Sequence, residues 1–460
     1  MDVVTQLKKF VEPRSVALFG ISRYPREGGF NILQNLLNYG YQGRIYPIHP
    51  EAEEILGVKT YARVAEVAED IDLAVINLPR SLVPGIARDC VEKGIAAIII
   101  ATQGFADAND MEGEQLQKEI DEIVRGKARV LGPNTFGTAN AFIDFSSSFA
   151  ELNMKRMPVG LICQSGVLYV GSPELRLLGK GIDLGNGCDL DFADALEYFE
   201  QDSDVRVVAL HTEGMRDARR FLSVAKRVAH KKPIVALKTG RTGLAAQAAQ
   251  SHTGSFAGKD EIWEVALKQS GITRVSDIDE LDDTVRILSA LPLMKGRKTG
   301  VLTYTGGFGV ASIDACQKFG LELAELSPAT AERLKEVYPP WLAVANPVDI
   351  WPATILSKRP MLKVFREALE ILFSDLAVDA VLCICGIWEN AVCNKFCQFT
   401  EKLAQNYPHK PLVWYLYGPL ANEAKSALED TGKTRAFSSP DRAIRALAHL
   451  ADYSQFLERF

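Results

Sequence analysis

A single histidine in a run of small residues is the first feature of this sequence that suggests chemistry. His252 lies in the stretch Ser251-His252-Thr253-Gly254-Ser255, with no bulky side chain next to it. Neutral imidazole is a nucleophile, and its ordinary pKa of about 6.5 keeps it largely neutral at cellular pH. Small neighbours leave room for a phosphoryl group, whose oxygens the hydroxyls of Ser251 and Thr253 can bind. The stretch therefore predicts either a phosphoryl-accepting histidine or a loop histidine satisfied by local hydrogen bonds.

A carboxylate is expected near this histidine. A strand over residues 233–238 leads to the His252 stretch, and the preceding strand, 207–213, ends at Glu213. Successive β-α units bring Glu213 and His252 to the same edge of one sheet. A carboxylate there can hold one imidazole nitrogen and orient the other. The alternative is that Glu213 is an acidic residue at the start of a helix.

Three times, the sequence places small residues between an apolar strand and a helical pattern. The strands are expected at 15–19, 159–163 and 299–304. Strand, small-residue turn and helix together offer backbone N–H groups to anionic oxygens. The first turn does not have the GxGxxG spacing, so it is a weak dinucleotide motif. The residues of the three turns are Gly20, Ile21 and Ser22, then Ser165 and Gly166, and finally Gly306 and Gly307.

Polar residues also follow the other strands expected in the first third of the chain. These strands alternate with helices, which predicts a parallel, doubly wound sheet whose carboxyl ends share one edge. The candidate ligand-binding residues at that edge are Asn77, Pro79, Thr102, Gln103 and Asn134. They favour a nucleotide-like ligand. An NAD site is disfavoured, because His49 and Pro50 stand where an acidic residue is expected after the second strand.

Composition narrows the possible functions. The net charge of −6 and the lack of a basic tract argue against nucleic-acid binding. The apolar runs are too short to span a membrane, and the first residues lack the apolar core of a signal peptide. Eight cysteines in 460 residues do not indicate a disulfide framework, so a reducing cytoplasm is expected. Neither Cys383-x-Cys385 nor Cys393-x₃-Cys397 has a zinc-site spacing, and no metal site is expected.

The length of 460 residues predicts about three domains, and the pattern predicts an α/β fold with three doubly wound sheets. The boundaries are expected at 1–149, 150–294 and 295–460. No Walker lysine or ATP-binding glycine loop is evident. The sequence therefore offers three candidate anion-binding turns and one candidate nucleophilic histidine, with no evident ATP site.

Several motifs together resemble the NDP-forming acyl-CoA synthetases, relatives of succinyl-CoA synthetase. The resemblance covers essentially the whole chain, in the same order, and corresponds to the α subunit. The motifs that carry it are VEPRSVALFGIS, RIYPIHP, LGPNTFG, CQSG, DLGNGCDLDFADALEYF, TEGMRD, ALKTGRT, SHTGS, TGGFG and NPVD. Departures from the usual pattern are Thr135 for cysteine, Phe308 for proline, Cys163 for serine and His49 for asparagine.

The resemblance implies roles that spacing alone does not give. The first domain would be a Rossmann-like CoA-binding domain, and the other two would be flavodoxin-like. His252 would be the phosphorylated histidine, with Glu213 as its partner and the turns at Ser165-Gly166 and Gly306-Gly307 on either side. The reaction would interconvert acyl-CoA, ADP and phosphate with carboxylic acid, CoA and ATP. A separate ATP-grasp β subunit would bind ATP or ADP and Mg²⁺ in an α₂β₂ assembly.

Two other functions remain open at this level. A CoA-binding or acyl-CoA-sensing protein without turnover would also lack a nucleotide domain. A dehydrogenase would require NAD binding by the first domain. The sequence does not identify the acyl group.

Overall fold

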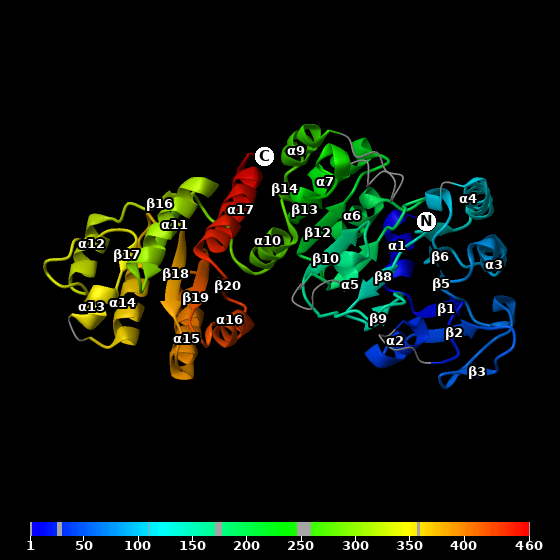
Figure 1. The fold of residues 1–460 in the computed structure, drawn as a ribbon, viewed down its shortest axis with the longest axis horizontal. Coiled ribbons are helices and arrows are strands. Elements are labelled where there is room, and N and C mark those ends of the chain that lie inside the picture. The colour runs from blue at the N-terminus through cyan, green and yellow to red at the C-terminus, as the bar shows by residue number, and fades with distance from the viewer. Residues whose placement is uncertain are drawn as a thin grey trace. The chain divides into compact units, whose positions relative to one another are not determined.

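The computed structural model describes residues 2–24, 30–108, 110–170, 177–245, 259–356 and 359–459 (Figure 1). The chain divides into two compact units, Met1–Leu281 and Asp282–Phe460. The first unit contains two large sheets and the second unit contains one. The predicted α/β fold with three doubly wound sheets is therefore confirmed, whereas the domain boundaries at 149/150 and 294/295 stay predictions.

The first sheet of unit 1 has the strand order β2-β1-β5-β6-β7 and is entirely parallel. Its inner strands are apolar and fully buried, as expected for a parallel sheet covered on both faces. The strands are β1 (Ser15–Phe19), β2 (Arg44–Ile48), β5 (Leu73–Ile76), β6 (Ala97–Ile100) and β7 (Arg129–Leu131). The helices of this part are α1 (Val3–Val11), α2 (Ile32–Tyr39), α3 (Val83–Glu92) and α4 (Met111–Val124). Short elements are the hairpin β3 (Glu54–Ile55) and β4 (Val58–Lys59), and the 3-10 turns η2 (Val64–Glu66), η3 (Arg80–Leu82) and η4 (Ala106–Ala108).

The second sheet has the order β14-β13-β12-β10-β11-β8-β9. Strands β10 to β14 are parallel, whereas β8 and β9 extend the sheet in antiparallel pairing. The strands are β8 (Thr138–Asn140), β9 (Phe145–Ser146), β10 (Val159–Cys163), β11 (Lys180–Asp183), β12 (Val207–Thr212), β13 (Ile234–Lys238) and β14 (Ile272–Val275). The helices are α5 (Val167–Val170), α6 (Phe192–Gln201), α7 (Ala218–Ala229) and α9 (Asp260–Gln269). Helix α10 (Ile278–Ala290) begins in unit 1 and continues into unit 2.

The sheets of unit 1 are joined both along the chain and by side-chain contacts. The chain passes directly from β7 of the first sheet to β8 of the second, through residues 132–137. In addition, the Arg129 guanidinium on β7 lies 2.9 Å from the Asp189 carboxylate and 3.0 Å from that of Asp194, in the first turn of α6. Arg220 on α7 contacts the other oxygen of Asp194 at 2.6 Å. This partly buried charge network fixes the first sheet to the helices of the second.

The sheet of unit 2 has the order β16-β15-β18-β19-β20, with β17 pairing beside the end of β15. Its strands are β15 (Lys298–Thr303), β16 (Glu322–Leu323), β17 (Val348–Asp349), β18 (Ala380–Gly386), β19 (Leu412–Tyr417) and β20 (Arg435–Phe437). Its helices are α11 (Gly306–Phe319), α12 (Pro328–Lys335), α13 (Trp351–Ile355), α14 (Met361–Ser374), α15 (Asn390–Asn406), α16 (Ala421–Asp430) and α17 (Pro440–Glu458).

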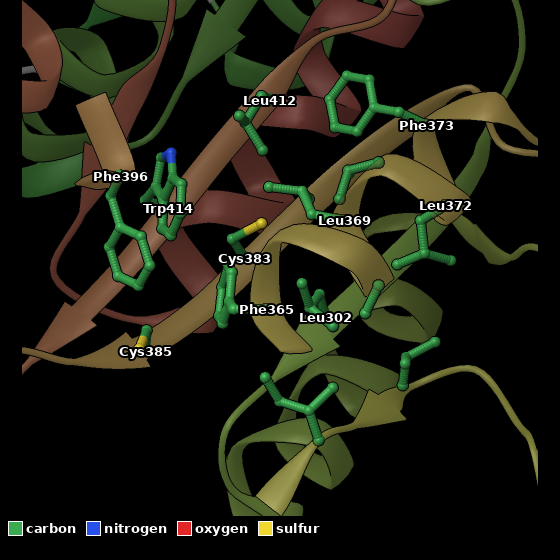
Figure 2. Packing of buried hydrophobic residues seen from close by; sticks show 14 of the residues in the cluster. Leu302, Phe365, Leu369, Leu372, Phe373, Cys383, Cys385, Phe396, Leu412 and Trp414 are labelled. Carbon is green, nitrogen blue, oxygen red and sulfur yellow. The ribbon is translucent and has the colours of Figure 1, made fainter. Parts of the chain in front are cut away.

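The core of unit 2 contains Cys383 and Cys385, one of the two cysteine pairs weighed as metal ligands. Figure 2 shows Cys383 among the side chains of Phe365, Leu369 and Trp414. Both Cys383 and Cys385 are fully buried in this apolar cluster, and burial raises the pKa of the Cys385 thiol to about 12. A buried thiol of this kind behaves as a small apolar side chain.

All three sheets share one strand order. If β17 is left aside, the first parallel strand in each sheet lies between the second and the third, followed by the fourth and fifth. The strand order reverses between the first and third strands, which makes this position the topological switch point of the sheet. Ligands of doubly wound sheets bind there, beyond the carboxyl ends of the strands. The three positions are the ends of β1 and β5, of β10 and β12, and of β15 and β18.

Candidate active site

The carboxyl edge of the first sheet is closely packed at the switch between β1 and β5. Gly20 follows β1 with φ +78°, and a Cβ on it would lie 2.0 Å from the Asn77 carbonyl oxygen. Only glycine fits this position. The Asn77 N–H donates to the Phe19 carbonyl at 3.0 Å, which brings the two strand ends together. Ile21 is buried and Ser22 is half-buried beyond this turn.

A pocket of about 500 Å³ lies at this edge. It collects four of the predicted ligand-binding residues, although they come from three different strand ends. These four residues are Asn77, Thr102, Gln103 and Asn134. The rest of the lining is Phe30, Leu78, Ala101, Thr135, Phe136 and Phe149. The other predicted residues, Gly20, Ile21, Ser22 and Pro79, are not part of its lining.

Hydrogen bonds between the loops hold the pocket residues in place. The Thr102 hydroxyl donates to the Leu78 carbonyl at 2.7 Å, and the Asn134 N–H donates to the Thr102 carbonyl at 2.9 Å. Asn134 itself has φ +58°, a conformation that asparagine tolerates better than most residues. The three strand ends thus form one connected polar rim.

Aromatic side chains form the wall of this pocket toward the second sheet, although neither is among the predicted ligand-binding residues. The rings of Phe136 and Phe149 have their centroids 4.6 Å apart. Gly166 packs directly on Phe136, since a Cβ on Gly166 would lie 2.0 Å from that ring. The predicted phosphate-binding turn Ser165-Gly166 therefore borders the pocket. In the sequence, Phe136 and Gly166 are far apart and share no motif, so no pattern could pair them.

A glutamine positions the predicted carboxylate. The Gln164 side-chain oxygen accepts hydrogen bonds from the backbone N–H of Glu213 at 2.8 Å, the N–H of Gly214 at 3.2 Å and the Thr212 hydroxyl at 3.1 Å. Glu213 is half-buried at the end of β12, beside the end of β10. One buried amide, that of Gln164, thus joins the Ser165 turn to Glu213, although Gln164 is not among the predicted site residues.

A buried carboxylate contacts residues next to both the Phe136 wall and the Gln164 turn. Asp183 ends β11 and is 1% exposed, and it accepts a hydrogen bond from the Phe136 N–H at 2.7 Å. The Cys163 thiol lies 3.6 Å from its other oxygen. Burial raises the pKa of Asp183 to about 6, although backbone hydrogen bonds oppose this rise.

The predicted residues Ser251, His252 and Thr253 lie outside the described residues, as does all of 246–258. The strand that leads to them is described. At its end, Lys238 is buried, donates to the Thr239 carbonyl and has its ammonium 5.5 Å from the centre of the Trp263 ring. Burial lowers the pKa of Lys238. Burial and the nearby Lys238 also lower the pKa of His211 to about 4, so His211 is neutral at neutral pH.

The end of the stretch is tied to its beginning by charge. Asp260, the first residue of α9, pairs with Arg274 on β14 and lies 3.4 Å from the Arg241 guanidinium. Arg274 also contacts Glu264 at 2.8 Å. These ion pairs fix the two ends of the segment that contains His252.

Gly306 and Gly307 belong to unit 2, where they are exposed and begin α11. Next to them, the Phe308 ring lies 5.0 Å from that of Tyr415 and 5.3 Å from that of Tyr417, centroid to centroid. Phe308 is the residue that replaces the usual proline, and its ring is held by the end of β19.

In the described ranges, no group of three or more histidine, cysteine, aspartate or glutamate side chains is arranged to hold a metal ion. None of the helices in the described part of the chain is long and apolar enough to cross a membrane.

Comparisons with known proteins connect this geometry to named families. Residues 14–141 match the CoA binding domain family, 156–288 the succinyl-CoA ligase like flavodoxin domain and 299–408 the Ligase-CoA domain. The ADP-forming acetate–CoA ligase II subunit alpha of Pyrococcus furiosus is 35% identical, with 93% of each chain covered. The ADP-forming acetate–CoA ligase of Methanocaldococcus jannaschii is 36% identical over 98% of this chain, which spans only 63% of that relative.

A solved structure agrees over nearly the whole chain. It is the dinucleotide-forming acetyl-coenzyme A synthetase 1 of Ca. Korarchaeum cryptofilum in complex with phosphate and ADP. The two chains are 31% identical, superpose with a TM-score of 0.88 and cover 98% of each other.

Proposed function

The chain belongs to the family of ADP-forming acetate–CoA ligases, the NDP-forming acyl-CoA synthetases, and we propose that it is the α subunit of such an enzyme. The proposed reaction is acyl-CoA + ADP + phosphate ⇌ carboxylic acid + CoA + ATP. The observation that carries the proposal is the match, over 93% of both chains, to a relative that is itself a separate α subunit. This chain spans 63% of a longer relative, which is the length expected if that relative carries further domains fused to its α-type part.

The pocket of the first sheet is proposed to bind CoA. The family match of residues 14–141 and the polar rim of Asn77, Thr102, Gln103 and Asn134 support this assignment. The turn of Gly20, Ile21 and Ser22, together with Pro79, is proposed to contact CoA outside that pocket. Because Gly166 packs on the pocket wall, a thioester bound there would be near the Ser165-Gly166 turn.

Phosphoryl transfer is proposed to proceed through His252. Phosphate attacks the thioester carbonyl, the C–S bond breaks, and CoA leaves as an acyl phosphate forms. A nitrogen of His252 then attacks phosphorus, and the carboxylate departs with the bridging oxygen. The phosphohistidine finally passes the phosphoryl group to ADP. Each intermediate retains a reactive bond, so catalysis consists mainly of positioning and charge stabilisation.

The other site residues have supporting roles in this proposal. Glu213 holds one nitrogen of His252, and the three hydrogen bonds to Gln164 support its position. The phosphoryl oxygens are bound by Ser165, Gly166, Ser251 and Thr253, and by Gly306 and Gly307 at the start of α11.

The reaction also requires a nucleotide site. We propose that a separate ATP-grasp β subunit binds ADP or ATP with Mg²⁺, in an α₂β₂ assembly. Names of relatives as α subunits support a partner chain of this kind. A cytoplasmic location, expected from the cysteine usage, belongs to the same proposal.

The test is acid-labile, base-stable labelling of the chain by radioactive phosphate in the presence of acyl-CoA. The assay compares wild type with His252→Ala, with and without the β subunit, over acetyl-, branched-chain and aryl-CoA. Label on wild type and none on His252→Ala is the expected result. Label that persists in His252→Ala refutes the phosphohistidine. CoA binding without label, even with the β subunit, would instead support a non-catalytic CoA sensor.

A further inference from the structure

The proposed reaction does not use the buried carboxylate of Asp183. This carboxylate nevertheless lies close to both the proposed CoA pocket and the proposed phosphate-binding turn. The side chain stands at the carboxyl end of β11, next to the end of β10. One oxygen accepts the hydrogen bond from the Phe136 N–H at 2.7 Å. The other lies 3.6 Å from the Cys163 thiol and 3.4 Å from the Gly185 N–H.

The same residue also holds the crossing segment through its backbone. The Thr135 hydroxyl donates to the Asp183 carbonyl, and the Asp183 N–H donates to the Gly137 carbonyl at 2.9 Å. Asp183 therefore holds three successive residues, 135 to 137, and two of them, Thr135 and Phe136, line the CoA pocket. Through its contact with Gly166, the Phe136 ring transmits this position to the predicted phosphate-binding turn.

We infer that Asp183 is a positioning residue that fixes the Phe136 wall of the CoA pocket against the Ser165-Gly166 turn. The inference rests on the proposed function, because it assumes that the pocket binds CoA. Asp183 acts through Phe136 and does not itself line the pocket. A charged carboxylate accepts an N–H hydrogen bond about twice as strongly as a neutral acceptor does. The wall is therefore held best when Asp183 is ionised.

Ionisation of Asp183 makes the inference measurable. Burial raises the pKa of Asp183 to about 6, so it loses its charge when the pH falls from neutral into the mildly acidic range. The titratable groups that face it in the described residues are the Cys163 thiol on β10 and the Tyr169 phenol on α5. Burial raises the pKa of both groups well above their usual values, so both stay neutral throughout this range.

The experiment is a calorimetric titration of the full chain with dephospho-CoA from about pH 5 to about pH 7.5. Dephospho-CoA avoids the phosphomonoester of CoA, because such a group has a second pKa near 6 and would titrate in the same range. The variants are Asp183→Asn and Phe136→Ala, with Asp121→Asn on α4 as the control carboxylate. Circular dichroism and thermal melting establish that each variant is folded.

We expect wild type and Asp121→Asn to bind about tenfold more weakly at the acidic end. Asp183→Asn should bind at every pH about as weakly as wild type does there. Phe136→Ala should bind weakly and show little pH dependence, because the ring that Asp183 positions is gone.

Three results would overturn the inference: a flat profile in wild type, a wild-type profile in Asp183→Asn, or a full pH effect in Phe136→Ala. If Asp183→Asn does not fold, the comparison of wild type with Phe136→Ala decides alone. Failure of folded wild type to bind dephospho-CoA or CoA at any pH contradicts the proposed function itself. If the protein binds dephospho-CoA but the pH dependence of its affinity is the same with and without Asp183, only the inference is contradicted.

Discussion

Replacing Gln164 with methionine should lower the stability of unit 1, its rate of phosphorylation, or both. Methionine has nearly the same shape but lacks the oxygen that accepts the N–H groups of Glu213 and Gly214. Gln164 is 9% exposed, so water cannot fully replace the lost acceptor. An orphaned buried donor costs about 1–3 kcal/mol, and two of them cost about 2–6 kcal/mol if the turn keeps its position.

The turn can avoid part of this cost only by moving, and a movement displaces Glu213. We therefore expect either a loss of stability of about 2 kcal/mol or more, or a smaller loss combined with impaired phosphorylation. A displacement of the reactive groups by about 1 Å costs about a hundredfold in rate. Thermal unfolding of the first unit and the rate of acid-labile labelling measure the two effects in the same preparation.

The matched control is Thr212→Val. It removes the hydroxyl that contacts the Gln164 oxygen at 3.1 Å and the Gly214 carbonyl at 2.9 Å but leaves both backbone N–H groups paired with the Gln164 oxygen. We expect it to cost about 1 kcal/mol and to change labelling only a few fold. If Gln164→Met melts within error of wild type and is labelled at the same rate, Gln164 does not position Glu213.

Further predictions concern the pocket wall, the pH dependence of stability and unit 2. Gly166→Ala should weaken CoA binding about tenfold by calorimetry, because its Cβ would lie 2.0 Å from the Phe136 ring; unchanged binding would contradict that contact. The raised pKa of Asp183 means that its contribution to stability is present below about pH 4 and lost as the pH rises through about 6. Denaturant titrations should show this loss, about 3 kcal/mol, in wild type relative to Asp183→Asn; parallel pH profiles would refute it. Glu429→Gln should destabilise unit 2 by about 3 kcal/mol, because it weakens the buried pair with Arg286; a change below about 0.5 kcal/mol would show that the pair contributes little.

The residues of the polar rim could be predicted because they follow strands that are recognisable from the sequence. The order of those strands places the residues at one edge, without any knowledge of side-chain packing. Asn77, Thr102 and Asn134 each follow a buried strand of a parallel sheet, and the carboxyl ends of such strands meet at one edge. The structure brings them together around one pocket, as expected. Gly20, at the switch between β1 and β5, lies at the same edge without lining the pocket.

The aromatic wall and its support could not be found in the same way. Phe136 and Phe149 lie in irregular segments, where no periodicity indicates which side chains are buried. The strand β11 was missed because Lys180-Gly-Ile-Asp183 contains two charged residues and a glycine. Its lysine is nevertheless buried, since it pairs with Asp202 at 2.7 Å and Asp204 at 2.9 Å. Pairing of this kind depends on tertiary contacts and leaves no local signal.

The aromatic wall and its support connect the first two sheets, which the proposed reaction requires to act together. A pocket at one switch point and a phosphate-binding turn at another would be independent if only a flexible linker joined their sheets. Here the chain leaves β7, lines the pocket with Thr135 and Phe136, and enters the second sheet as β8, which pairs with β11. Asp183 at the end of β11 holds this crossing from one side, and Gly166 receives the Phe136 ring from the other. Because packed interiors transmit displacements instead of absorbing them, occupancy of the pocket and the position of the turn should be coupled.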